Sequence, residues 1–454
     1  MPKAKLVSIG DSLTQGFQSF AISDTRFSYP ALIAESLGAR EAFALPDFRG
    51  SGGLPLNLEW LARRLEDRFG ADIGMFEWFR SLHVIPDLIS EVEEYWERGR
   101  GAAPIADTLY HNLAVWGFEA GDAYGLTPQI CDERIGKPKD DWFSPPSVPR
   151  LRTARRVLNP AQLAERNADT QLSVARKIAQ KQGGIEHLIV ALGSNNCLGT
   201  VVQLKMIETS DEPPGVCSKF TLWKPAAFAK EFDRLAQEVS SIDADHVYVA
   251  TVPHVTIPPI TRGIMKSRGN LPPDEKYFDF YTRFWIHDKE FDEARDPKLT
   301  KADAIKIDSY IDQYNLHIRA VAAARGFHVV DMCVLLDGLA VRRNHGRPTF
   351  QLPPALSDLS TRLFETTPAG RIKSGGLISL DGVHPTACGY ALIAQEFINV
   401  MKAKGTAPQA RDIDFARVRR GDTLVSAAPR TLDDTLGALR TLEEHFHISR
   451  WLQG

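Results

Sequence analysis

Short apolar runs recur along the chain, each five to seven residues long and rich in β-branched side chains. Runs of this length and composition are typical of strands that are covered on both faces of a sheet. The sequence therefore predicts strands at residues 5–9, 110–115, 187–192, 246–252 and 327–331.

Between these runs, apolar residues recur at steps of three and four, which is the spacing of an amphipathic helix. Four such stripes lie within residues 164–179, 228–239, 307–321 and 391–401. Gly326 follows the third stripe, at the kind of position where a helix commonly ends. The alternation of strands and helices predicts an α/β fold built on a parallel sheet.

Three stretches do not fit this alternation, at about residues 41–105, 254–300 and 337–378. Because the strands resume after each stretch, we expect insertions within one domain that covers residues 1–402. Residues 403–454 then form a C-terminal extension. A terminal helix is predicted within it from the spacing of Leu432, Leu436, Leu439 and Phe446.

Composition narrows the class of protein. The 54 Lys and Arg against 57 Asp and Glu give a net charge of −3, without the basic excess that favours a nucleic-acid partner. Five Cys are too few for a disulfide scaffold, and no Cys–His spacing is typical of zinc, so we expect neither a metal nor a cofactor. No apolar run reaches the roughly 20 residues of a membrane span. The first run stops at Gly10, short of a signal peptide's apolar core, so we expect a cytoplasmic protein.

The first predicted strand leads directly into the segment Gly10-Asp11-Ser12-Leu13-Thr14-Gln15-Gly16. Ligands bind beyond the carboxyl ends of strands in open α/β sheets. Ser12 stands at such an end and at the expected start of a helix, where developing negative charge is favoured. It is a candidate nucleophile, and the alternative is that Asp11 or Ser12 only caps the helix.

A serine nucleophile needs a base, which a third group must orient. Asp381 and His384 supply this pair at a spacing that lets them face each other within one turn, and Pro385 favours a helix start just after them. The same spacing arises by chance at Asp243 and His246. That pair precedes its strand, so we expect it to be structural.

Acyl transfer also needs donors that face the developing oxyanion. The predicted strand at 187–192 ends in Gly193-Ser194-Asn195-Asn196, where the Asn195 amide is a candidate donor. A plain turn is the alternative, because Gly, Ser and Asn are common turn residues. Gly117, after the second predicted strand, could add a backbone N–H.

Together these segments resemble the SGNH/GDSL hydrolase family. The family's first block is matched at Gly10 to Gly16, its Gly-x-Asn block at Gly193 and Asn195, and its Asp-x-x-His block at Asp381 and His384. The resemblance implies a flavodoxin-like, three-layer α/β/α fold with a mainly parallel sheet, here enlarged by insertions. It implies a GDSL-like lipase or esterase that forms an acyl-enzyme.

The resemblance also implies the role of each site residue. Ser12 would be the nucleophile, His384 the base and Asp381 the group that orients it. The backbone N–H groups of Ser12 and Gly117 and the side chain of Asn195 would form the oxyanion hole. Two departures stand out: Asn196 replaces the family's usual Asp, and the surroundings of Gly117 match the second block poorly, so that Gly121 is a fallback.

Two other classes of function share features with this sequence. A binuclear metallophosphoesterase needs His where this chain has Leu13 and Asn196, so metal-dependent phosphate chemistry is not expected. The other is a binding module that keeps the fold without the activity, but such a module has little reason to retain the three triad residues.

Seven aromatic residues fall within residues 277–291, far more than the 9% aromatic content of the chain predicts. They follow the fourth predicted strand, so they could form a lid or an acyl-binding wall for lipid-like esters. The alternative is helix-spaced packing within the insertion itself. Acetylated carbohydrates or other small acyl esters remain the alternative substrates, and the sequence leaves the oligomeric state open.

Overall fold

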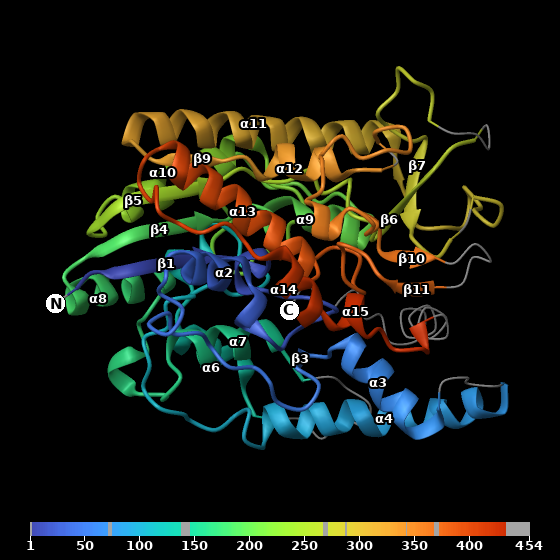
Figure 1. The fold of residues 1–454 in the computed structure, drawn as a ribbon, viewed down its shortest axis with the longest axis horizontal. Helices are drawn as coiled ribbons and strands as arrows, with labels where there is room; N and C mark the ends of the chain where they lie inside the picture. The colour runs from blue at the N-terminus through green and yellow to red at the C-terminus, as the bar shows by residue number, and fades with distance from the viewer. Residues whose placement is uncertain are drawn as a thin grey trace.

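The computed structural model describes residues 2–70, 75–137, 146–266, 271–286, 288–341, 343–366 and 372–432. At its centre is a sheet of four parallel strands in the order β1-β4-β5-β9 (Figure 1). The strands are β1 (Ala4–Gly10), β4 (Ile185–Ala191), β5 (Ala244–Ala250) and β9 (His328–Val330). The predicted α/β class with a parallel sheet is confirmed.

Both faces of the sheet are covered by apolar side chains, as the continuous apolar runs require. One face, with Leu6, Ile189 and Tyr248, packs against α2 (Tyr29–Ser36) and α13 (Ala387–Ala403). The opposite face, with Val7 and Leu188, packs against three helices. These helices are α8 (Gln171–Gln182), α10 (Pro225–Val239) and α11 (Lys301–Arg325).

The four predicted helical stripes correspond to α8, α10, α11 and α13. The first helix begins later than its stripe, because the side chain of Thr170 caps α8 in a capping box with Ser173. Residues Ala164–Arg166 form only a short 3-10 turn, η2. Gly326 ends α11 in the left-handed conformation, with φ of 71°, as predicted from its position.

The predicted strand at 110–115 is not a strand of the sheet. The segment runs beside β1 and forms a single parallel bridge between Ser8 and Asn112. It makes three backbone hydrogen bonds with β1, from the Ser8 N–H to the His111 carbonyl at 2.8 Å, from the Leu113 N–H to the Ser8 carbonyl at 2.9 Å and from the Val115 N–H to the Gly10 carbonyl at 3.1 Å. The Leu113 carbonyl, which the next rung of a ladder would use, instead accepts a hydrogen bond from the Gln171 side chain at 2.8 Å.

The predicted insertions form small elements around one end of the sheet. The first contains β3 (Leu54–Pro55), α3 (Leu58–Phe69) and α4 (Met75–Glu97), and β3 pairs with β2 (Ala21–Ile22). The second contains an antiparallel sheet of β6 (Thr261–Ile264), β7 (Phe280–Arg283) and β8 (Leu299–Thr300). The third contains the 3-10 turn η3 (Pro354–Leu356) and the pair β10 (Phe364–Thr366) and β11 (Ile372–Gly375).

The aromatic stretch around residues 277–291 is therefore not the helix that its spacing allowed. Phe280 to Arg283 form β7, in keeping with the strand preference of aromatic and β-branched residues. None of the helices in the described ranges is long and apolar enough to cross a membrane.

The remaining helices are short and lie around the site or on α13. They are α1 (Ser12–Gln15), η1 (Thr25–Phe27), α5 (Asp122–Gly125), α6 (Pro128–Ile135), α7 (Pro149–Leu158), α9 (Asn195–Gln203), α12 (Met332–Leu339), α14 (Phe415–Gly421) and α15 (Thr423–Ser426). The described part of the C-terminal extension packs on α13, where the buried Asp422 accepts the Cys388 N–H at 2.9 Å. The predicted terminal helix lies outside the described residues beyond Leu432.

Candidate active site

The turn after β1 places Ser12 at the carboxyl end of the sheet. Asp11 caps α1 by accepting the Leu13 N–H at 3.1 Å, so capping occupies Asp11 rather than Ser12. Gly10 allows the turn to be this tight, because a Cβ there would lie 2.2 Å from the Thr14 hydroxyl. Ser12 is therefore the first residue of α1, with a side chain free to take another partner.

That partner is His384, in the loop before α13. The Ser12 Oγ lies 2.9 Å from His384 Nε2, and His384 Nδ1 lies 3.0 Å from Asp381 Oδ2. All three residues are buried, with exposed fractions of 5% or less. The structure thus joins residues 372 positions apart in one hydrogen-bonded chain with the order that serine activation requires.

The Asp381 carboxylate is held as an anion. Burial by itself would raise its pKa, but the His384 imidazole and the surrounding hydrogen bonds outweigh burial and lower the pKa. Its oxygens accept the N–H groups of Phe20 at 3.1 Å, Val383 at 2.9 Å and His384 at 2.8 Å. The carboxylate therefore has a fixed orientation and can stabilise a positive charge on the imidazole.

Asp11 has the opposite electrostatic character. Its side chain is fully buried, and burial raises its pKa to about 7. The capping bond from Leu13 and the nearby His384 lower the pKa, but less than burial raises it. Close to neutral pH the hydrogen-bonded chain of Ser12, His384 and Asp381 therefore contains an ionised carboxylate, Asp381, while the nearby Asp11 titrates.

Gly117 lies in the loop that follows the Asn112 segment. It adopts a left-handed φ of 75°, and its carbonyl accepts the Arg150 Nη1–H at 2.9 Å. A Cβ on Gly117 would lie 2.6 Å from the Arg150 side chain, so the close approach requires glycine. Within the described chain, the backbone N–H groups of Gly117 and Ser12 have no hydrogen-bond partner.

Asn195 is the first residue of α9, just beyond β4. Its Nδ2 donates to the Phe118 carbonyl at 2.9 Å, and an amide group has a second N–H to offer. Asn196 supports the same loop, because its Oδ1 accepts the Ala120 N–H at 3.2 Å. A carboxylate could accept this bond equally, so the replacement of the family's Asp leaves the loop's support in place.

Two side chains that hold this loop were not singled out from the sequence. The buried Arg150 of α7 binds the Gly117 carbonyl, and Gln15 of α1 accepts the Trp116 N–H at 2.9 Å. Arg150 is 33 positions from Gly117 and Gln15 is 101 positions from Trp116. No local motif could have indicated either contact.

A cavity of about 1130 Å³ opens beside Ser12 and His384. Its walls come from the loops after β5, from α12 and from the second and third insertions, and they include Phe278, Tyr281 and Phe284. Ser194 lines the cavity, whereas the neighbouring Asn195 and Gly117 are not part of the lining. The aromatic insertion therefore does form a wall of the space that a bound molecule would occupy.

The second Asp-x-x-His pair, Asp243 and His246, lies at the other end of the sheet. His246 is in the first half of β5, and its ring stacks on that of His187 and makes a tilted contact with that of His328. The structure therefore keeps it away from the Ser12 cavity, whose lining does not include it.

Comparison with known proteins finds a family model and solved structures that match the chain. The model of the GDSL-like Lipase/Acylhydrolase family matches residues 6–397. Among solved structures, an extracellular lipase from Streptomyces rimosus is similar at 13% identity and a TM-score of 0.32, over 88% of this chain and 99% of the lipase. LAE5, an alpha/beta hydrolase enzyme from the metagenome of Lake Arreo, Spain, is similar at 14% identity and a TM-score of 0.28, over 88% of this chain and 96% of that one. No curated protein matches the chain.

Proposed function

Because the chain belongs to the GDSL-like lipase/acylhydrolase family and is an ester-hydrolysing enzyme, we propose that Ser12 is its nucleophile, with His384 as general base and Asp381 as the orienting carboxylate. The observation that carries the proposal is the unbroken chain from Ser12 Oγ to His384 Nε2 and from His384 Nδ1 to Asp381 Oδ2, at 2.9 and 3.0 Å. The first distance is short enough for a proton to pass from Ser12 to His384, and the second is short enough for Asp381 to orient the imidazole.

The reaction proceeds in two steps. Ser12 Oγ attacks the ester carbonyl while its proton passes to His384 Nε2, and His384 then returns the proton to the leaving alcohol. Water attacks the resulting acyl-enzyme with His384 again as the base, which releases the acid and restores the Ser12 hydroxyl. Asp381 stabilises the imidazolium in both steps through Nδ1.

The oxyanion is stabilised by the Ser12 and Gly117 N–H groups and by the second N–H of the Asn195 amide. What supports this assignment is that the two backbone groups have no other partner in the described chain, while Arg150 and Asn196 fix the loop that carries Gly117. Donors that are oriented before the reaction cost no reorganisation in the transition state.

The substrate is an ester with an extended apolar acyl chain. The cavity of about 1130 Å³ exceeds the usual range for small-molecule sites, and its walls include aromatic and aliphatic side chains beside charged ones such as Arg262 and Arg343. An acetyl group would fill only a small part of it. Burial of each further methylene contributes about 0.8 kcal/mol, so longer chains gain binding energy until the cavity is full.

A series of p-nitrophenyl esters of increasing acyl length tests both the Ser12 nucleophile and the preference for an apolar acyl chain. We expect hydrolysis by the wild-type protein, with kcat/KM rising from acetyl toward longer chains, and no hydrolysis by Ser12→Ala. Hydrolysis that persists in Ser12→Ala rejects the nucleophile. Hydrolysis that needs Ser12 but is fastest on acetyl rejects the apolar substrate and favours a small-acyl or carbohydrate acetylesterase.

A further inference from the structure

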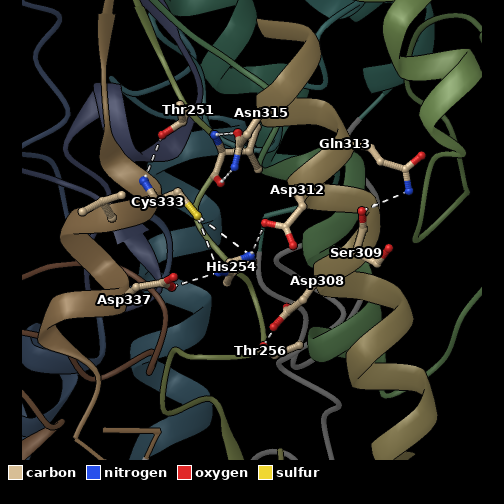
Figure 2. Close-up of polar contacts among 12 residues, drawn as sticks. Thr251, His254, Thr256, Asp308, Ser309, Asp312, Gln313, Asn315, Cys333 and Asp337 are labelled. Carbon is tan, nitrogen blue, oxygen red and sulfur yellow. Dashed lines mark hydrogen bonds and ion pairs between the residues drawn. The ribbon is translucent and has the colours of Figure 1, made fainter. Parts of the chain in front are cut away.

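A second cluster of reactive side chains lies beyond the carboxyl end of β5 (Figure 2). His254 follows that strand, and its Nδ1 lies 2.8 Å from Asp337 Oδ1 and 3.5 Å from Cys333 Sγ. Cys333 and Asp337 are one turn apart on α12. In the described ranges, this is the one group of three His, Cys, Asp or Glu side chains whose ligand atoms all lie within 4.8 Å of one another.

The backbone on both sides of the cluster is fixed. The Asn315 side chain of α11 accepts the Val252 N–H at 2.7 Å and donates to the Val252 carbonyl at 2.9 Å. The Thr251 hydroxyl accepts the Cys333 N–H at 3.0 Å, which ties the start of α12 to the end of β5. These contacts, visible around the cluster in Figure 2, hold His254 and Cys333 at a set separation.

The separations suit a tetrahedral zinc ion. With Zn–N near 2.1 Å and Zn–S near 2.3 Å, two ligands of one tetrahedral ion lie about 3.5 Å apart. The observed distance from Cys333 Sγ to His254 Nδ1 is 3.5 Å. Asp337 Oδ1 lies 2.8 Å from Nδ1 and would have to withdraw by about 0.6 Å to reach the roughly 3.4 Å that separates N and O ligands of one tetrahedral zinc. Its side chain is 40% exposed and has room to do so.

The other ring nitrogen of His254 already has the partner that a metal-bound histidine needs. Nε2 lies 3.2 Å from Asp312 Oδ1 of α11. A ligating imidazole almost always donates its second N–H to a carboxylate or carbonyl, which fixes its tautomer. Arg343 approaches Asp337 at 3.8 Å, but its closer ion pair is with Asp308.

We propose that His254 Nδ1, Cys333 Sγ and Asp337 Oδ1 bind one Zn²⁺ ion, with Asp312 orienting the imidazole. One nitrogen, one sulfur and one oxygen ligand form a donor set that suits zinc rather than magnesium or calcium, which prefer oxygen. Three protein ligands leave the fourth position to water or to a polar group of a bound molecule. Of the three ligands, His254 lines the same cavity as Ser12, whereas Cys333 and Asp337 are not part of its lining.

Titration with Co²⁺, which replaces Zn²⁺ in such sites and is visible by absorption, tests the proposal on the full-length protein. We expect a thiolate-to-cobalt charge-transfer band that saturates at one Co²⁺ per chain and disappears when Zn²⁺ is added. The band should be absent in Cys333→Ser and retained in Cys217→Ser, a partly exposed free cysteine elsewhere in the chain. Asp312→Asn should keep the band and weaken the affinity about 10–100-fold.

No thiolate band in the wild-type protein overturns the proposal, and so does a band that survives Cys333→Ser. If Cys333→Ser does not fold by circular dichroism, Asp337→Asn replaces it, because that side chain is partly exposed and its loss should weaken Co²⁺ binding without unfolding. An unchanged affinity in Asp337→Asn also overturns the proposed ligand set. The readout does not involve ester hydrolysis, so its failure is distinct from a failure of the Ser12 assignment.

Discussion

Histidines lie toward both ends of the strands of the parallel sheet, and their surroundings differ. Beyond the carboxyl ends, His384 has a buried carboxylate on one nitrogen and the Ser12 hydroxyl on the other. His254 lies between two carboxylates, those of Asp337 and Asp312. In each case a carboxylate next to the ring can fix the orientation and tautomer of the imidazole.

In the first halves of the strands, His187, His246 and His328 contact one another instead. Their ring centroids are 5.6 and 5.7 Å apart along the row, and the polar partner of His187 is the Tyr248 hydroxyl at 3.2 Å. Burial lowers the pKa of His187 to about 4 and lowers that of His328. The histidines beyond the carboxyl ends therefore contact carboxylates, whereas at the other end burial favours the neutral forms of His187 and His328.

The largest expected effect separates the two ends directly. His384→Ala should lower kcat for a p-nitrophenyl ester by about 10⁴-fold or more, because Ser12 then has no base. His246→Ala, at the amino end, should leave kcat unchanged. Steady-state kinetics on both variants test this, with circular dichroism as the check on folding. Equal losses of kcat in the two variants would show that the catalytic histidine cannot be identified from its place beyond the carboxyl ends of the strands.

The next effect concerns the donors around the oxyanion. Asn195→Ala should lower kcat by about 10²–10³-fold with little change in KM, because the amide N–H bonds the oxyanion only in the transition state. Pre-steady-state kinetics should place the loss in acylation or deacylation rather than in substrate binding. A loss of only a few-fold would leave Asn195 with its bond to the Phe118 carbonyl as its sole role.

The histidines at the amino end of the sheet should affect the stability of the protein rather than its catalysis. Since His187 titrates near pH 4 when folded and near its ordinary 6.5 when unfolded, the unfolded chain binds the extra proton first as the pH falls. This residue's contribution to stability is complete above pH 6.5 and is lost toward pH 4, by up to about 3 kcal/mol.

Urea unfolding of the wild-type protein and His187→Gln at pH 7 and pH 5 measures that contribution. The variant should lose less stability than the wild type between the two values. The wild type has to be compared with the variant, because Asp11 also changes the stability between these pH values. Its pKa is raised to about 7, so it stabilises both proteins as the pH falls, in the opposite direction to His187. The same loss in both proteins would show that His187 does not titrate as its burial requires.

The smallest effect concerns the cavity wall. Phe284→Ala removes apolar surface from the wall, so the preference for long over short acyl chains should fall about tenfold in relative kcat/KM. Turnover of the shortest ester should change little, because Ser12 and His384 are untouched. An unchanged preference would mean that the acyl chain does not contact this aromatic insertion.

The sequence was most informative where the chemistry is local. Gly10 to Gly16 is a short segment that contains the turn, the capping residue Asp11 and the proposed nucleophile Ser12. Asp381 to His384 is a short segment that contains both members of the hydrogen-bonded Asp–His pair. That the two segments lie close together then follows from one rule, because parallel strands present their carboxyl ends to the same edge of a sheet. The four sheet strands and the helices that cover them could also be predicted, because hydrophobic periodicity is a local property of the sequence.

What could not be predicted depends on contacts between distant residues. The apolar run at 110–115 has the composition of a strand, but the Gln171 side chain, 58 positions from Leu113, takes the Leu113 carbonyl that the ladder would use next. The aromatic stretch allowed a helix by spacing, and its pairing with β6 and β8 made it a strand. His254 and Cys333 are 79 positions apart, so no ligand spacing could have indicated their cluster.

Labelling with a fluorophosphonate followed by peptide mass spectrometry tests the central assignment most directly. An activated serine Oγ attacks phosphorus and displaces fluoride, which leaves a stable adduct on that residue. The assignment predicts one adduct per folded chain on the peptide that contains Ser12, lost on unfolding in urea and strongly slowed in His384→Ala. No adduct in the folded protein, or an adduct on another residue, would contradict it.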